Sequence, residues 1–228
     1  PVDESIKEDA AAAAVVAEFE KRLSAELDGP VGTTRVELDA RQETNRSRET
    51  NLGSFIADAY RRQTGAQVAL LNGGSIRSNT TYGPGALSKR DVLSILPFEN
   101  SIVKIEVTGA TLRAALEHGV ARVREEPEAG RFPQVSGLSF SYDARRPAGS
   151  RVTAVAVGGQ PLDDKKTYTL ALSNFVREGG DGYTMFKDAP LLLKPEEAQV
   201  EPAMLMNIIT AAGEIAPAVD GRIARSDK

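Results

Sequence analysis

The chain contains no cysteine, which excludes disulfides and thiolate metal sites. Histidine is nearly as scarce, since His118 is the only one among the 228 residues. A dinuclear hydrolytic metal centre draws on several histidines and carboxylates, and one histidine cannot supply that ligand set. We therefore assign no metal ligand and no catalytic residue to this chain. His118 is interpreted as a structural residue of a helix.

Other absences narrow the function further. No apolar run approaches the roughly 20 residues of a membrane span. The sequence has neither a Gly-x-Ser-x-Gly nucleophile elbow nor a Gly-x-x-x-x-Gly-Lys phosphate loop, which argues against a serine hydrolase and a P-loop enzyme. A net charge of −4 argues against binding of nucleic acid polymers. The start Pro1-Val-Asp-Glu-Ser has no initiator methionine, so we expect a domain cut from a longer chain.

Helix and strand signals are mixed along the chain. The charged, alanine-rich stretch Asp3–Leu27 predicts an N-terminal helical arm within residues 1–30, either a connection to another domain or a helix packed on this one. Residues 31–228 predict one α+β domain with a mixed β-sheet core and packed helices. The predicted strands are Val31–Leu38, Val68–Leu71, Ser101–Val107, Leu138–Tyr142, Arg151–Val157 and Thr167–Leu172. The predicted helices are Leu52–Gln63, a short one capped by Ser88 and Asp91, Thr111–Arg124 and Ala203–Ala212, with a polar loop over Arg41–Arg48.

The motif Asn72-Gly-Gly-Ser-Ile-Arg77 directly follows the apolar strand Val68–Leu71 and therefore lies at a strand end. Its two glycines allow a sharp turn and a close approach of the backbone to a ligand. Three further motifs accompany it: Arg46-Ser-Arg-Glu-Thr-Asn-Leu-Gly53, Leu96-Pro-Phe98 and Ser173-Asn-Phe-Val-Arg-Glu-Gly-Gly-Asp-Gly-Tyr183. Arg46 and Arg48 of the first of these lie just before a predicted helix N-terminus, where backbone N–H groups and the helix dipole favour anions.

In this order, the four motifs resemble the C-terminal domain of the 5'-nucleotidase family, from about Val31 to about Arg222. The resemblance implies a nucleotide-binding module that normally follows an N-terminal metallophosphatase domain, which this sequence lacks. It implies two divalent metal ions in that missing domain and no cofactor in this chain. Because the family is mostly exported, the resemblance also implies a periplasmic, secreted or cell-surface location, as in bacterial relatives.

Phe98 and Phe175 are the aromatic residues that the resemblance singles out. Aromatic residues make up only 5% of the chain, and both of these lie in polar turns. Taken alone, the residues favour plain core packing. The resemblance instead implies that the two rings stack on either side of a nucleotide base, an interaction worth roughly 1–3 kcal/mol per base.

The remaining site residues are polar. Asp181 lies in Gly179-Gly-Asp-Gly182, which is either a tight turn or a loop that brings a carboxylate to the vicinal hydroxyls of a ribose. The resemblance favours ribose binding, and it implies sugar and phosphate contacts for Arg46 and Arg77 and a base-edge contact for Asn72. Arginine suits such oxygen-rich targets because its donors are fixed in one plane. Weaker candidates are Arg48, Gly73 and Gly74.

The preferred hypothesis is the substrate-recognition domain of an exported 5'-nucleotidase-like phosphoesterase, whose parent chain is a metal-dependent 5'-nucleotidase. This chain alone would bind a nucleotide or nucleoside without hydrolysing it. One alternative is a relative that acts on cyclic nucleotides or, as a UDP-sugar hydrolase does, on nucleoside diphosphate sugars. Another is a stand-alone nucleoside-binding protein without a hydrolase partner.

Overall fold

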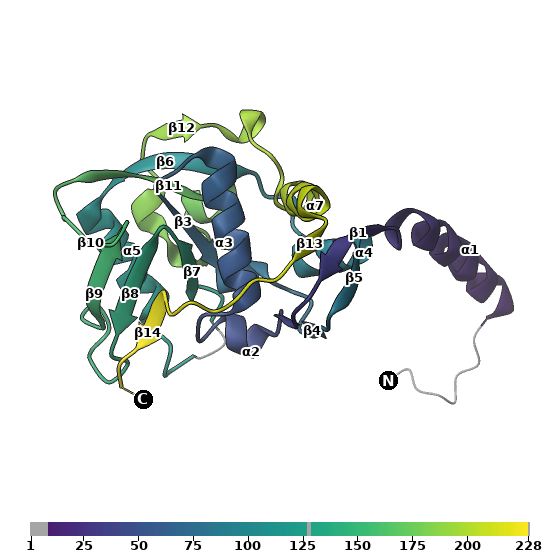
Figure 1. Ribbon diagram of the computed structural model, residues 1–228, viewed down its shortest axis with the longest axis horizontal. Coiled ribbons are helices and arrows are strands. Elements are labelled where there is room, and N and C mark those ends of the chain that lie inside the picture. The colour runs from purple at the N-terminus through teal and green to yellow at the C-terminus, as the bar shows by residue number, and fades with distance from the viewer. Residues whose placement is uncertain (1–8, 127–128, 228) are drawn as a thin grey trace.

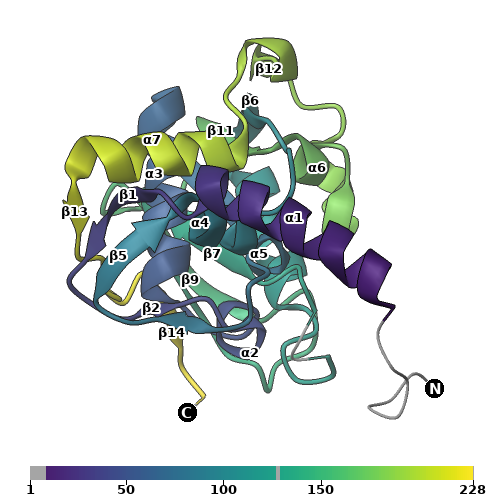
Figure 2. The ribbon, with the colours of Figure 1, turned by 90° about the vertical axis from the view of Figure 1, so that its right-hand side faces the viewer.

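The computed structural model describes residues 9–126 and 129–227, and its first element is a projecting helix. Helix α1 (Ala10–Leu27) begins at Asp9, whose side chain accepts from the backbone N–H groups of Ala11 and Ala12. Figure 1 shows α1 extending away from the body of the protein, and Figure 2 views the protein from the side on which α1 projects. It contains no buried residue, so the alternative of a helix packed on this domain is wrong. The predicted start at Asp3 lies outside the described residues.

The body is organised around a five-stranded sheet in the order β12-β6-β11-β3-β7. Strands β11 and β3 are parallel, whereas the other neighbours are antiparallel. The strands are β3 (Val68–Asn72), β6 (Ile102–Thr108), β7 (Pro133–Ser136), β11 (Thr167–Ser173) and β12 (Leu191–Leu193). The mixed pairing confirms the predicted mixed-sheet α+β class.

Each face of this sheet covers its own hydrophobic core, as the alternation within β3 shows. Val68 and Leu70 pack into one core, and Ala69 and Leu71 pack into the other. The first core lies against α5 (Gly109–Val120) and the sheet β10-β9-β8-β14. Helices α3 (Asn51–Thr64) and α7 (Glu201–Ala212) cover the second, and Figure 1 shows α3 lying across the sheet.

Smaller elements complete the body. The four-stranded sheet consists of β8 (Leu138–Tyr142), β9 (Val152–Val157), β10 (Gln160–Pro161) and β14 (Ile223–Arg225). A three-stranded sheet joins β1 (Pro30–Thr34), β5 (Gly85–Ser88) and β13 (Glu214–Ile215), and β2 (Leu38–Asp39) pairs with β4 (Thr81–Tyr82). The short helices are α2 (Gln42–Asn45), α4 (Lys89–Ile95) and α6 (Asn174–Arg177), with 3-10 turns at Gly73–Ser75, Gly180–Gly182, Thr184–Phe186 and Pro195–Glu197.

Local structure differs from the sequence predictions in several places. The strand predicted over Val31–Leu38 is divided into β1 and β2. The predicted loop Arg41–Arg48 contains α2, which is held by Asn45: its Nδ2 donates to the Asp39 and Arg41 carbonyls, each at 2.9 Å. Strand β7 was not predicted, because it begins with a proline and is only four residues long. By contrast, the capping box of Ser88 and Asp91 is confirmed at the start of α4.

A buried carboxyl joins α7 to the rest of the second core. Glu201, the first residue of α7, is fully buried and accepts a hydrogen bond from the Tyr60 hydroxyl of α3. Its Oε2 accepts from Nδ2 of Asn100 at 3.1 Å, and its backbone N–H donates to the Asn100 carbonyl at 2.9 Å. Burial raises the pKa of Glu201 from its ordinary value of 4.5 to about 7, although the hydrogen bonds from Tyr60 and Asn100 oppose that increase.

We expect Glu201 to make stability depend on pH. The folded protein binds this proton more tightly than the unfolded chain, so the free energy of unfolding should fall as the pH rises from 4.5 through about 7. Relative to Glu201→Gln, which keeps the shape without titrating, the loss should reach about 3 kcal/mol. Urea unfolding of both proteins across this range measures it, and parallel pH profiles would contradict the expectation.

Candidate functional site

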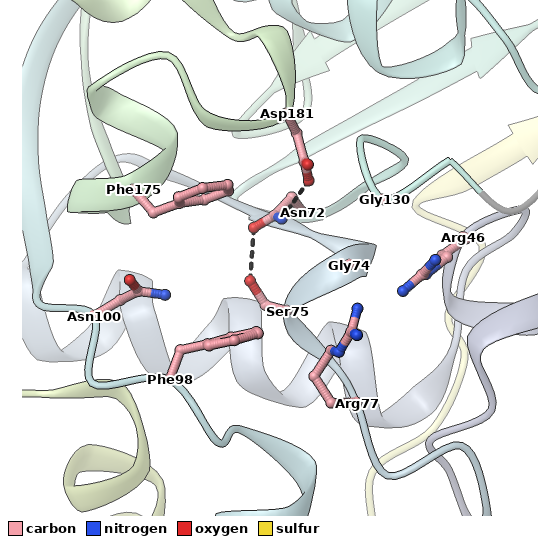
Figure 3. A pocket seen from close by; sticks show the side chains of 10 residues that line it. All are labelled: Arg46, Asn72, Gly74, Ser75, Arg77, Phe98, Asn100, Gly130, Phe175 and Asp181. Carbon is pink, nitrogen blue, oxygen red and sulfur yellow. Dashed lines mark hydrogen bonds between the residues drawn. The ribbon is translucent and has the colours of Figure 1, made fainter.

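One cavity of about 280 Å³ collects side chains from segments far apart in the sequence. Its volume is near the lower end of the usual range for small-molecule sites, about 300–1,000 Å³. Figure 3 shows its lining: Arg46, Asn72, Gly74, Ser75, Arg77, Phe98, Asn100, Gly130, Phe175 and Asp181. All six main residues predicted from the sequence are among them. Of the weaker candidates, Gly74 lines the cavity.

Phe98 faces the cavity from the loop that follows α4, and Phe175 faces it from the short helix α6, where the sequence predicted a turn. They remain 44% and 42% exposed, so plain core packing does not describe either ring. Figure 3 shows the rings one above the other with open space between them, which we call the aromatic slot. Gly180 makes room for the Phe175 ring, since a Cβ there would lie 2.4 Å from its Cε1. Both rings are therefore partly open to the cavity, and their stacking on a base stays a prediction.

Two hydrogen bonds between Ser101 and Asn174, one to the Asn174 side chain and one between backbone groups, tie the Phe98 loop to helix α6. The Ser101 N–H donates to Oδ1 of Asn174 at 3.0 Å, and the Asn174 N–H donates to the Ser101 carbonyl at 2.9 Å. Asn174 immediately precedes Phe175, and Ser101 lies three residues after Phe98. Because these contacts join the end of the Phe98 loop to the start of α6, they limit the separation of the two rings.

Asp181 is held at the cavity by a relay of side chains. Oδ2 of Asp181 accepts from Nδ2 of Asn72 at 2.6 Å, and Oδ1 of Asn72 accepts from the Ser75 hydroxyl at 2.7 Å. These contacts fix which way the Asn72 amide points. The base-edge contact assigned to Asn72 stays a prediction, but its hydrogen bonds and its 3% exposure favour a second role, which is to hold Asp181.

The backbone around Asp181 is unusual. Asp181 has a φ of 51°, in the left-handed region that non-glycine residues seldom adopt. The space for its carboxylate comes from two facing glycines: a Cβ on Gly130 would lie 3.0 Å from Oδ2 of Asp181, and a Cβ on Gly74 would lie 2.8 Å from the Gly130 Cα. The Gly74 N–H also donates to the Gly130 carbonyl at 2.8 Å. The lack of a side chain at Gly74 and Gly130 therefore allows these two backbone segments and the Asp181 carboxylate to lie close together.

His118 contacts the backbone of the segment that carries Asp181. Its Nε2 lies 2.8 Å from the Asp181 carbonyl oxygen, and its ring packs edge-on against Tyr183 with centroids 4.8 Å apart. Burial lowers the pKa of His118, while the contact with the Asp181 carbonyl opposes that change. A neutral ring whose Nε2–H donates to this carbonyl satisfies the geometry. This placement agrees with the structural role predicted for His118 and connects that role to Asp181.

Arg46 and Arg77 give the side of the cavity away from Asn100 a positive character (Figure 3). The Arg77 guanidinium carbon lies 5.8 Å from the centroid of the Phe98 ring, within the range of a cation–π contact. Arg46 follows α2 and also lines the cavity. Among the described residues that line the cavity, Asp181 is the one carboxylate, so these lining residues together carry an excess of positive charge, which suits an anionic group.

Two weaker candidates lie elsewhere. Arg48 is exposed, and its carbonyl accepts from Nε2 of Gln134 at 2.7 Å. Gly73 is buried against α2, where a Cβ would lie 2.1 Å from the Asn45 carbonyl oxygen. Neither lines the cavity.

Sequence reasoning missed three lining residues: Ser75, Asn100 and Gly130. Asn100 had a usable signal, because it lies two residues after Phe98 in the same polar turn. Ser75 is inside the motif that starts at Asn72, but its contribution is a hydrogen bond that only the fold reveals. Gly130 had no signal beyond its turn-rich surroundings.

The described residues contain no group of three or more His, Cys, Asp and Glu side chains that could hold a metal ion. The side chains of the described residues therefore do not fit a dinuclear metal centre. None of the described helices has the length and apolar character needed to span a membrane.

Comparison with known proteins identifies the family. Residues 30–188 match the family model for the 5'-nucleotidase, C-terminal domain. The chain belongs to this family. It is 37% identical over 199 residues to the trifunctional nucleotide phosphoesterase protein YfkN of Bacillus subtilis, covering 83% of this chain and 13% of that protein. It is 31% identical over 241 residues to a 5'-nucleotidase of Homo sapiens, covering 97% of this chain and 41% of that protein.

A solved structure agrees with the sequence comparisons. The 5'-nucleotidase precursor from Thermus thermophilus matches with a TM-score of 0.88 and 34% identity, covering 99% of this chain and 45% of that one. The family resemblance and the predicted fold class are thus confirmed. The chain spans less than half the length of each of these relatives, so it corresponds to one part of each of them.

We expect Gly180→Ala to displace the Phe175 ring from the cavity of this 5'-nucleotidase C-terminal domain. The added Cβ would overlap the ring, which is partly exposed and can rotate outward, so stability should change by only about 0.5 kcal/mol. A crystal structure and a thermal melt of the variant measure both effects. Gly83→Ala is the matched control, because a Cβ there meets no atom within 4 Å. An unmoved Phe175 ring in Gly180→Ala would contradict the expectation.

Proposed function

We propose that this chain is the nucleotide-recognition domain of an exported 5'-nucleotidase-like phosphoesterase, and that it binds the base and ribose of its substrate. The observation that carries the proposal is the meeting of two exposed aromatic rings, a held carboxylate and two arginines at one cavity (Figure 3). A nucleotide consists of the matching groups: a flat base, a sugar with vicinal hydroxyls and an anionic phosphate.

The base enters the aromatic slot in this proposal. Phe98 and Phe175 each offer a ring face, and stacking on such rings contributes roughly 1–3 kcal/mol per base. Every base has a π-face, so the rings provide affinity with little discrimination between bases. Asn100 lies at the side of the slot away from Arg46 and Arg77 and is placed to contact the base edge (Figure 3).

The ribose meets Asp181 in this proposal. A carboxylate can accept hydrogen bonds through two oxygens, and Asn72 uses only part of that capacity. Vicinal ribose hydroxyls are matching donors, and hydrogen bonds to a charged group are stronger than neutral ones. Arg46 and Arg77 then face the sugar oxygens and the phosphate.

Hydrolysis takes place outside this chain in this proposal. Two divalent metal ions, held by an N-terminal metallophosphatase domain of the same parent chain, would supply the activated water. The proposed work of this chain is to bind, orient and present the nucleotide. Alone, it would bind nucleosides without turnover.

We expect calorimetry to show that the isolated chain binds adenosine, adenosine monophosphate or UDP-glucose. The variant Phe175→Ala should weaken the binding of adenosine by roughly 1–3 kcal/mol, because it loses the stacking on this ring. Phe19→Ala is the matched control, because Phe19 is a 59% exposed phenylalanine on the projecting helix α1. Equal affinities for wild type and Phe175→Ala would place the ligand elsewhere. Failure of all three ligands to bind would overturn the proposed function.

We expect Asp181→Ala to weaken adenosine binding by about 1.5–3 kcal/mol, the range for a hydrogen bond to a charged group. The affinity for free adenine should change little, because adenine has no ribose. Calorimetry with both ligands measures the difference, with Asp188→Ala as an acidic control from the same segment. Equal losses for adenosine and adenine would mean that Asp181 maintains the loop and does not contact the sugar.

A further inference from the structure

Glu201 is a buried ionisable group one hydrogen bond away from the aromatic slot. It does not line the cavity, but its Oε2 accepts from Nδ2 of Asn100, which does. The Asn100 side chain is therefore shared between a buried carboxyl and the proposed base site. Its backbone is also fixed, because the Asn100 carbonyl accepts from the Glu201 N–H.

Because Tyr60 occupies one oxygen of the Glu201 carboxyl, the other oxygen is the one that can either accept a hydrogen bond from Asn100 or donate one to it. Burial, with the nearby Glu201 charge, raises the pKa of Tyr60 well above 10, so Tyr60 stays protonated and donates to Oε1. Oε2 is left for Asn100. When Oε2 is ionised, it accepts from the Asn100 amide nitrogen and leaves the amide oxygen available. When Oε2 carries a proton, it can donate to that oxygen after the amide turns over, and the NH₂ group becomes available instead.

We propose that Glu201 is a positioning residue that sets whether Asn100 presents an amide oxygen or an amide NH₂ group to the 6-substituent of a purine. This inference rests on the proposed function, in which the ribose lies towards Asp181. The 6-position of a purine is far from the ribose and thus points towards Asn100. The amide oxygen accepts from the 6-amino group of adenosine, whereas the NH₂ group donates to the 6-oxo group of inosine.

The charged groups on the elements packed around Glu201 have other partners or face solvent. On α3, Asp58 pairs with Arg222, and Arg61 donates to Ser136. Three others are exposed: Arg62, Glu99 and Lys89. The rest have partners: Arg90 pairs with Asp28, Asp91 accepts from Ser88, Lys104 donates to the Thr64 carbonyl, and Glu214 pairs with Arg35. Among the described residues, Tyr60 and Asn100 are thus the polar side chains hydrogen-bonded to the Glu201 carboxyl. Glu201 is the group on these elements whose titration acts directly on the Asn100 amide.

The test is calorimetric titration of the chain with adenosine and inosine at about pH 5.5 and about pH 8, on either side of the Glu201 transition. We expect the ratio of adenosine to inosine affinity to rise about three- to tenfold with pH, the range for one neutral hydrogen bond. In Glu201→Gln, which does not titrate, the ratio should be the same at both pH values. Glu99→Gln is the matched control, since it removes an exposed carboxyl from the same loop and should leave the wild-type pH dependence intact.

Purine riboside, which has no 6-substituent, separates the two proposals. It should bind in the slot with an affinity that does not depend on pH. If neither purine riboside nor adenosine binds, the proposed function and this inference both fail. If both bind with sensitivity to Phe175→Ala, but the adenosine to inosine ratio stays constant with pH, only the inference is overturned.

A second measurement needs no ligand. The side-chain amide resonances of Asn100 should shift with pH in the wild type and stay constant in Glu201→Gln. Tyr60→Phe removes the donor to Oε1, which helps to hold the carboxylate ionised, so the midpoint of the shift should move to higher pH. Resonances of Asn100 that do not respond to pH in the wild type would contradict the coupling.

Discussion

The register of β11 against its two neighbours is the constraint on which the candidate site depends. Ser173, the last residue of β11, pairs with Ile102, the first residue of antiparallel β6. The loop before β6 and helix α6, which directly follows β11, therefore leave the sheet at the same edge. Strand β3 runs parallel to β11, so Asn72 at its end reaches that edge as well. One sheet thus brings together Phe98, Phe175 and the strand-end motif.

The side chains at this edge are held by interactions that the sheet alone does not provide. Ser101 and Asn174 join the Phe98 loop to the start of α6, and the hydrogen bonds from Ser75 through Asn72 fix the Asp181 carboxylate. Buried polar groups are costly unless hydrogen-bonded, so Ser75 and Asn72 stabilise the fold and the site together. The glycines complete the arrangement by removing side chains where the backbone and the rings come close.

Whether a feature of this structure can be predicted from the sequence depends on how far apart in the sequence the interacting residues are. Helix α3 and the capping box of α4 were predictable, because their signals are local: an apolar stripe with Gly65 as its end, and Ser88 followed by Asp91. Strand β7 was missed because its stability comes from pairing with β3, which no short segment encodes. Likewise, the motifs indicated the six main lining residues, whereas the contacts of Glu201 join residues 60, 100 and 201 and only the fold brings them together.

A crystal structure of the chain with adenosine monophosphate bound tests the central claim most directly. The account predicts the base between the rings of Phe98 and Phe175, the ribose hydroxyls within hydrogen-bonding distance of Asp181, and the phosphate on the side of Arg46 and Arg77. A nucleotide bound at another surface, with the aromatic slot empty, would contradict it.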